Sequence, residues 1–145
     1  MIQDIVNGII AAILGAFPGA DIHDEKVKQG FETPCFIIRC LNPLSEQFLG
    51  KRYYRENLFS VQYIPGDDEN ANSECYKVQD VLFRALEYIT VTGDLQRGTN
   101  MRGEVIDGVL TFLINFNMFI SVEPLEPLEE LEELEQVETI VKQGE

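Results

Sequence analysis

Residues 24–41 read D-E-K-V-K-Q-G-F-E-T-P-C-F-I-I-R-C-L, and residues 52–65 read R-Y-Y-R-E-N-L-F-S-V-Q-Y-I-P. Each segment places apolar side chains at a period of two close to a proline, which is the pattern of a half-buried β-strand. A polar joint and a loop holding Gly50, Lys51 and Arg52 link the two segments. Neither segment pairs a nucleophile with a base or carries a phosphate loop or metal-ligand cluster. The pattern therefore predicts that this part of the chain forms a surface for contacts and not a catalytic site.

Two amphipathic helices are predicted on either side of these strands. The first covers residues 2–17, ends at Gly15 or Pro18, and has apolar side chains at steps of three and four: Ile2, Ile5, Val6, Ile9, Ile10, Ile13, Leu14 and Phe17. A short strand, residues 20–23, is expected after it. The second helix covers residues 72–89, with an apolar face of Cys75, Val78, Leu82, Ala85, Leu86 and Ile89.

Small residues thin the other face of the first helix, at Gly8, Ala11 and Ala12. One interpretation is a helix that packs on its own sheet. The other is that these residues allow close approach by a neighbouring molecule.

The C-terminal half of the domain returns to strand patterns. Residues 95–105 are rich in glycine and charge, and Asp107-Gly108 is a hairpin turn pair. A long half-buried strand then presents one row of Leu110, Phe112, Ile114, Phe116, Met118 and Ile120. Because strands and helices are segregated along the chain, we expect an α+β fold with a mostly antiparallel sheet and two main helices packed on one face.

The 145 residues fit one domain, which we place at residues 1–122, followed by an acidic extension at residues 123–145. The extension repeats apolar residues at steps of three, at Leu125, Leu128, Leu131, Leu134, Val137 and Ile140. Three residues fall short of a helical turn, so this stripe drifts around a helix. A short acidic helix that docks on a neighbour and a disordered polyacidic end both fit this pattern.

Charge is concentrated in that extension. The total is −14, and the segment after Val122 contributes −8 with nine Glu and one Lys, so the first 122 residues carry −6. A mildly acidic domain argues against a surface that neutralises nucleic-acid phosphates.

Three cysteines, Cys35, Cys40 and Cys75, are an odd and unpatterned set that fits a reducing compartment. Cys35 and Cys40 are five apart in a predicted strand, so their side chains point to opposite faces. The N-terminus lacks the basic start and cleavage site of a secretory signal. The apolar run at residues 109–120 is too short and too polar to span a bilayer, so we expect a soluble chain with no membrane partner.

No constellation for catalysis stands out. His23 is the single histidine and has no serine or cysteine at a meaningful spacing. Glycines recur at fives from Gly93 to Gly108 without forming a dinucleotide or phosphate motif, and metal-ligand pairs such as C-x-x-C are absent. We therefore predict that the chain is not an enzyme and has no catalytic residue, cofactor site or metal site.

Arginines and tyrosines stand out against the acidic background and form the predicted subunit or partner interface. They are Arg52, Tyr53, Tyr54, Arg55, Arg97 and Arg102. Both residue types are enriched at protein interfaces because they bury large areas and hydrogen-bond at their tips. An acidic surface elsewhere would make such a patch complementary to another copy of the chain.

Short motifs in the same region resemble one protein family. They are Gln29-Gly30-Phe31, Pro34-Cys35-Phe36, Arg52-Tyr53-Tyr54-Arg55 and the run from Phe59 to Pro65. They are similar to the tail terminator proteins of phages of Gram-positive bacteria, and most similar to those of contractile-tailed defective prophages. The similarity runs from the N-terminal helix to about Val122 and leaves out the acidic extension.

The resemblance implies a structural role in a virion tail. Such proteins form a ring, usually a homohexamer, on the head-proximal end of the tail tube, in the neck or collar region, and assemble in the host cytoplasm. The ring stops polymerisation of the tube and provides a docking face for the head or neck connector. The implied partners are the tail tube protein and, in contractile tails, the sheath protein, while DNA passes through the lumen without specific binding.

Two other classes remain open at this stage. One is an acidic DNA mimic or inhibitor that binds a basic host protein, which the net charge favours. The other is a small-molecule hydrolase, which lacks a nucleophile constellation in the sequence.

Overall fold

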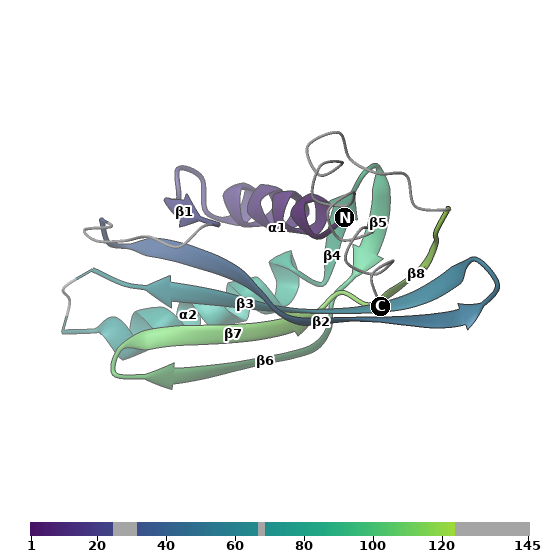
Figure 1. Ribbon diagram of the computed structural model, residues 1–145. Coiled ribbons are helices and arrows are strands. Elements are labelled where there is room, and N and C mark those ends of the chain that lie inside the picture. The colour runs from purple at the N-terminus through teal and green to yellow at the C-terminus, as the bar shows by residue number, and fades with distance from the viewer. Residues whose placement is uncertain (25–31, 67–68, 124–145) are drawn as a thin grey trace, which may run out of the picture.

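A computed structural model describes residues 1–24, 32–66 and 69–123 of the chain (Figure 1). Within these residues the elements, in chain order, are α1 (Ile2–Ala16), β1 (Ile22–His23), β2 (Cys35–Leu49), β3 (Arg52–Ile64), α2 (Ala71–Ala85), β4 (Tyr88–Val91), β5 (Asp94–Arg97), β6 (Thr99–Ile106), β7 (Val109–Asn115) and β8 (Met118–Ser121).

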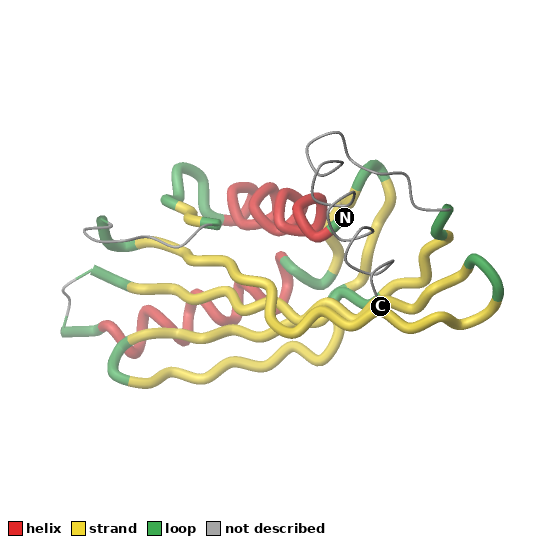
Figure 2. The backbone as a smooth tube through the Cα atoms, viewed as in Figure 1, coloured by secondary structure: helices red, strands yellow, loops and turns green. Residues whose placement is uncertain are grey.

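The main sheet has the strand order β1-β2-β3-β7-β6, and β8 also pairs with β3 (Figure 2). Every pair in it is antiparallel except β1 with β2, which is parallel. Strands β4 and β5 form a separate two-stranded sheet. The strand β3 lies at the centre, because it pairs along its length with β2 on one side and with β7 and then β8 on the other.

One buried core joins both helices to one face of the main sheet. It contains Ile5, Ile9 and Ile13 of α1, Val78 and Leu82 of α2, and the sheet residues Phe36, Ile38, Phe59, Val61, Leu110, Phe112 and Ile114. These sheet residues are paired across neighbouring strands, so they share one face. The predicted α+β class, with a mostly antiparallel sheet and two helices on one face, is confirmed.

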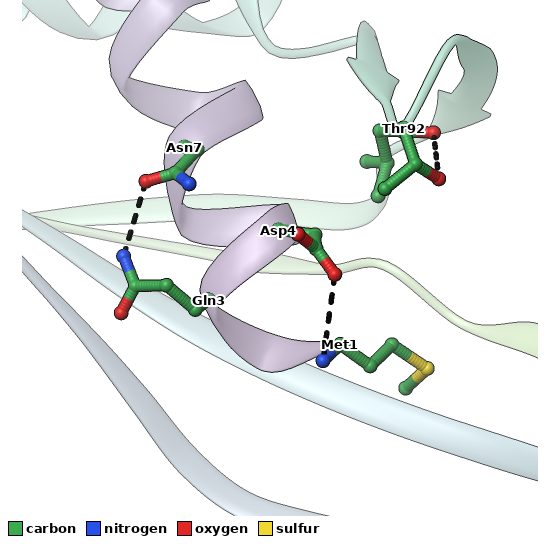
Figure 3. A network of polar contacts seen from close by, with 6 residues as sticks. Met1, Gln3, Asp4, Asn7 and Thr92 are labelled. Atoms are coloured by element: carbon green, nitrogen blue, oxygen red, sulfur yellow. Dashed lines mark hydrogen bonds and ion pairs between the residues drawn. The ribbon is translucent and has the colours of Figure 1, made fainter.

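The first turn of α1 is held by local polar contacts, shown in Figure 3. The N-terminal ammonium of Met1 lies 3.5 Å from the Asp4 carboxylate, and Gln3 Nε2 donates to Asn7 Oδ1 at 3.0 Å. An acidic side chain in the first turn is favourable because the helix dipole is positive there. Close by, the Thr92 hydroxyl donates to the carbonyl oxygen of Val91 at the turn between β4 and β5.

Gly8 packs α1 against its own molecule. A Cβ atom at this position would lie 2.6 Å from the carbonyl oxygen of Thr90 in β4. The interpretation in which the small face of this helix packs on its own sheet therefore holds at Gly8.

The polar joint after Leu41 is strand and not a loop. β2 continues to Leu49, with a register shift in its pairing to β3 between Leu41 and Leu44. The predicted loop holding Gly50, Lys51 and Arg52 is a turn at Gly50 and Lys51, and Arg52 already pairs with Leu49 as the first residue of β3. A bulge lets a strand absorb the extra residues while the pairing resumes beyond it.

The second helix is shorter than predicted, because it ends at Ala85 and Tyr88 begins β4. Leu86 and Ile89 are buried in the core as predicted, although neither of them lies in the helix. Residues 95–105, which are rich in glycine and charge, lie almost entirely in two strands, residues 94–97 and 99–106. The β4–β5 hairpin was missed because its strands are only four residues long.

The Asp107-Gly108 hairpin is confirmed, with both residues at positive φ, 53° and 74°. The predicted strand at residues 110–121 is split into β7 and β8 by Phe116 and Asn117. Phe116 is nevertheless fully buried, as the alternation predicts.

The three cysteines are free thiols, and burial raises the pKa of each one. Over the described parts of the chain, no helix is both long and apolar enough to cross a membrane. The expectations for the acidic extension fall on residues 124–145, which lie outside the described residues.

Candidate functional site

The hairpin of β2 and β3 extends well past the ends of both helices (Figure 1). We call its far half the arm: residues 44–49, the turn at Gly50 and Lys51, residues 52–56, and β8 alongside. Gly50 has a φ of 59°, which suits glycine in a two-residue turn. The arm is therefore a three-stranded sheet built from two distant parts of the sequence.

Aromatic rings gather on one face of the arm. The ring centroid of Phe119 lies 5.2 Å from that of Phe48 and 5.1 Å from that of Tyr54. Phe48 is 60% exposed, Phe119 is 50% exposed and the neighbouring Leu49 is 71% exposed. Phe59 and Val61 of β3 belong to the core, so Ser60 between them faces away from the helices. Tyr54 lies an even number of residues from Ser60 along β3 and therefore shares that outward face.

A guanidinium group covers two of these rings. The Arg52 Cζ atom lies 5.8 Å from the centroid of Phe48 and 5.3 Å from that of Phe119, within the range of cation–π contacts. No carboxylate within 4.0 Å of the Arg52 guanidinium is found among residues 1–24, 32–66 and 69–123. We call Phe48, Leu49, Arg52, Tyr54 and Phe119 the arm surface.

A hollow of about 250 Å³ lies beside these rings, lined by Glu46, Gln47, Phe48, Tyr54 and Phe119. Desolvation and then the nearby Glu56 carboxylate raise the pKa of the Tyr54 phenol. The protonated phenol is therefore favoured, and the Glu56 carboxylate is its hydrogen-bond acceptor. The aromatic lining suits an apolar side chain, and the nearby cationic group is the Arg52 guanidinium over Phe48 and Phe119.

The other two predicted residues of this segment, Tyr53 and Arg55, point to the opposite face of the arm because the strand alternates. Arg55 is half-buried, and its Nε atom is buried without a hydrogen-bond partner in the described part of the chain. The four consecutive residues from Arg52 to Arg55 therefore serve two faces and not one patch.

Arg97 and Arg102 lie on strands outside the arm. Arg97 is on β5, with its Nη2 atom 4.0 Å from Glu87 and its Cζ atom 6.0 Å from the ring centroid of Tyr88. Arg102 is on β6 and pairs with Leu113, which pairs in turn with Ser60 of β3. Since Ser60 and Arg52 are eight residues apart on one strand, roughly 26 Å separate their positions.

Arg102 has a counterpart that sequence reasoning missed. Arg39 pairs with Ser60 from the β2 side, so Arg39, Ser60, Leu113 and Arg102 form one cross-strand row on the face opposite the helices. Both arginines are exposed. This row is a second basic feature on the same side of the main sheet.

The aromatic members Phe48 and Phe119 were also missed. Phe48 sits two residues before the turn glycine, and Phe119 falls in the row opposite the predicted core row. An apolar residue on the outward side of a strand, close to a hairpin tip, was the available signal.

The region around His23 holds the closest approach to a catalytic grouping. His23 Nε2 lies 3.3 Å from Asp21 Oδ2, and Asp21 is near enough to Cys35 to raise the pKa of its thiol further, after burial. Cys35 is 1% exposed. A raised thiol pKa disfavours the thiolate, so this grouping does not activate Cys35 as a nucleophile.

Within residues 1–24, 32–66 and 69–123, no three His, Cys, Asp or Glu side chains gather closely enough to hold a metal ion.

One protein family and one solved structure are similar to this chain. A family model described as phage tail terminator protein matches residues 4–127. No curated protein matches the chain. One solved structure is similar over 87% of this chain and 99% of its own length, at 14% sequence identity and a TM-score of 0.42. At that level of similarity it carries no argument about this chain.

Proposed function

The chain belongs to the phage tail terminator family, and on that premise we propose that it forms a hexameric ring on the head-proximal end of a tail tube. Membership in the family makes its role structural, in a phage tail. In the proposed ring, the subunits stop further addition of tube protein and offer a docking face to the head or neck connector. The family match favours this role over an acidic inhibitor of a basic host protein.

The exposed surface of the arm supports ring formation. The arm extends past the helices and exposes the aromatic side chains of Phe48 and Phe119. It also exposes the Arg52 guanidinium, which has no carboxylate within 4.0 Å in the described part of the chain. Patches of this kind mark sites of protein contact. We propose that the arm reaches a neighbouring subunit or the last tube ring, with Arg52 and Tyr54 making contacts on one face of the arm and Tyr53 and Arg55 on the other.

Arg97 and Arg102 complete the proposed set of contacts. Each lies on a strand other than β3, so a subunit could use them toward a different neighbour from the one that the arm meets. In a closed ring every subunit uses two different surfaces, which is consistent with basic groups at separate places.

The remaining features of the proposal concern the tail as a whole. The sequence motifs similar to contractile-tailed prophages support a contact with the last sheath ring and a location in the neck of the particle, after assembly in the host cytoplasm. The net charge of −6 on the first 122 residues supports a lumen through which DNA passes without specific binding.

Purified protein tests the proposal directly. We expect light scattering after size exclusion to give the mass of six chains, and electron micrographs to show rings that cap polymers of the cognate tube protein. A chain that stays monomeric at high concentration and leaves tube growth unchanged would contradict it.

A charge reversal in the arm sharpens the experiment. We expect Arg52→Glu to reduce ring formation by about tenfold or more, as for an interface hot spot. The control Lys77→Glu makes the same change of charge on an exposed face of α2 and should leave rings intact. Equal loss in both variants would assign the effect to net charge and not to the arm.

A further inference from the structure

The arm surface exposes an unusual amount of apolar area for a hairpin tip. Phe48, Leu49 and Phe119 are each at least half exposed and lie together. Soluble monomers rarely leave such contiguous patches open unless something binds there. In an isolated subunit, this surface is therefore expected to be covered.

The chain itself leaves the described structure at this point. The Val122 N–H donates to the carbonyl oxygen of Lys51 at 2.8 Å, and Lys51 Nζ lies 3.3 Å from Glu123 Oε2. Residues 124–145 therefore begin beside the arm turn. Extended, 22 residues reach up to roughly 70 Å, several times the length of the arm.

The composition of that segment suits the arm surface. It holds leucines at steps of three, Leu125, Leu128, Leu131 and Leu134, among eight glutamates. A leucine side chain suits the apolar hollow beside Phe48 and Phe119, and a glutamate suits Arg52. The face also carries Glu46 and Glu56, so the attraction is local to Lys51 and Arg52 and the apolar contact must supply most of the binding.

We propose that residues 124–145 fold back on the arm surface of their own chain and cover it. The occupant is the chain's own segment because its attachment at Glu123 gives it an effective concentration of about millimolar at the arm. A second copy reaches that concentration only in a concentrated solution. Most of the segment lies beyond the family match at residues 4–127, so the cover does not rest on residues that the family model matches.

This inference does not depend on ring formation, since it concerns the isolated chain. A partner that binds the arm surface must first displace the segment. Failure of the cover would therefore leave the proposed ring untouched, and absence of rings would leave the cover untouched.

A single tryptophan tests the proposal, because the chain contains none. In the full-length Phe48→Trp variant, we expect the indole to be shielded from acrylamide. Adding Leu125→Ser, Leu128→Ser, Leu131→Ser and Leu134→Ser should raise the quenching constant about twofold or more and shift the emission to longer wavelength. Phe119→Trp provides a second probe on the same surface.

A matched control places the indole elsewhere. Tyr76 is 55% exposed on α2, so quenching of a Tyr76→Trp variant should not change with the leucine substitutions. Identical quenching of the arm probes with and without the leucines would overturn the proposal. All of these variants are compared at a dilution where light scattering gives the mass of one chain, so that contacts between copies at the arm do not shield the probes.

Discussion

Gly8 shows how one missing side chain sets the distance between α1 and β4. The carbonyl oxygen of Thr90 lies 2.6 Å from the position that a Cβ atom of residue 8 would take, and that oxygen belongs to the backbone and cannot rotate away. The same helix contains Gly15, which has open space around it. The two glycines lie in one helix and differ in packing, so the same substitution at Gly15 is a control for the substitution at Gly8.

We expect Gly8→Ala to lower the free energy of unfolding by about 1–3 kcal/mol, because the added methyl group overpacks the contact. Gly15→Ala, in contrast, should raise it by about 0.5–1 kcal/mol, since alanine is the better helix former. Urea denaturation of both variants measures the difference. A gain in stability for Gly8→Ala would mean that α1 does not lie this close to β4.

Tyr63 couples β3 to α2 through a buried phenol. Its hydroxyl donates to Glu74 Oε1 at 3.1 Å, and burial followed by that contact raises the pKa of the phenol well above its ordinary value. The protonated phenol is thus favoured by folding. The stabilisation is complete below the ordinary pKa of about 10 and is lost as the pH rises from there toward the folded pKa.

We expect the free energy of unfolding to fall above pH 10 by up to about 1.4 kcal/mol per pH unit from this residue alone. Tyr63→Phe should cost about 1 kcal/mol at neutral pH and flatten the alkaline decline. Denaturant titrations at several pH values measure both effects. Tyr76→Phe on the exposed face of α2 is the control, and an equally flattened curve there would contradict this origin.

At the scale of elements, Asn57 marks the place where the neighbour of β3 changes from β7 to β8. Asn57 is 1% exposed, its Nδ2 atom donates to the Phe116 carbonyl oxygen at 3.0 Å, and its carbonyl oxygen accepts from the Phe116 N–H at 2.9 Å. Asn117 Oδ1 in turn accepts from the Asn57 N–H at 3.3 Å. These bonds satisfy the backbone where regular pairing is interrupted.

Replacing this amide should loosen the arm. We expect Asn57→Ala to lower the free energy of unfolding by about 1–3 kcal/mol, because a buried carbonyl loses its donor, and to speed hydrogen exchange in β8. Gln47→Ala removes an equivalent 3.0 Å bond to the Gly50 carbonyl on the exposed surface, and should cost less than about 0.5 kcal/mol. Unchanged exchange in β8 would contradict the role given to Asn57.

At the scale of the whole molecule, one surface has two proposed uses. The arm surface would bind a neighbour in the ring and, before that, the acidic segment of its own chain. Two occupants of one surface compete, so the segment would hold back assembly until the local concentration of partners is high. In this proposal the acidic excess after Val122 would act on assembly.

Neutralising that segment should promote assembly. With Glu129, Glu130, Glu132 and Glu133 changed to glutamine, we expect the concentration at which rings form to fall by about threefold or more. The control Asp80→Asn with Glu69→Gln, Glu104→Gln and Asp107→Asn removes the same charge from exposed positions of the domain, which reports general self-repulsion. Light scattering over a dilution series measures both, and an equal shift would contradict competition at the arm.

Much of the fold could be predicted because local periodicity is strong. The alternation around Phe59 and Phe112, the helical spacing of Ile5, Ile9 and Ile13, and the Asp107-Gly108 pair are each decided by the side chains of one segment. The arginines and tyrosines of the arm were also visible as an unusual composition. Their division between two faces follows from strand alternation once the strand is known.

What the amino-acid sequence determined by itself is the burial of each element, since the pattern of apolar residues specifies which side leaves water. The tertiary structure alone decided that β2 continues through its polar joint, that β8 joins β3 beyond Asn57, and that Phe48, Phe119 and Arg52 meet. Pairing between strands depends on hydrogen bonds to distant segments, and those partners leave no trace in the local pattern.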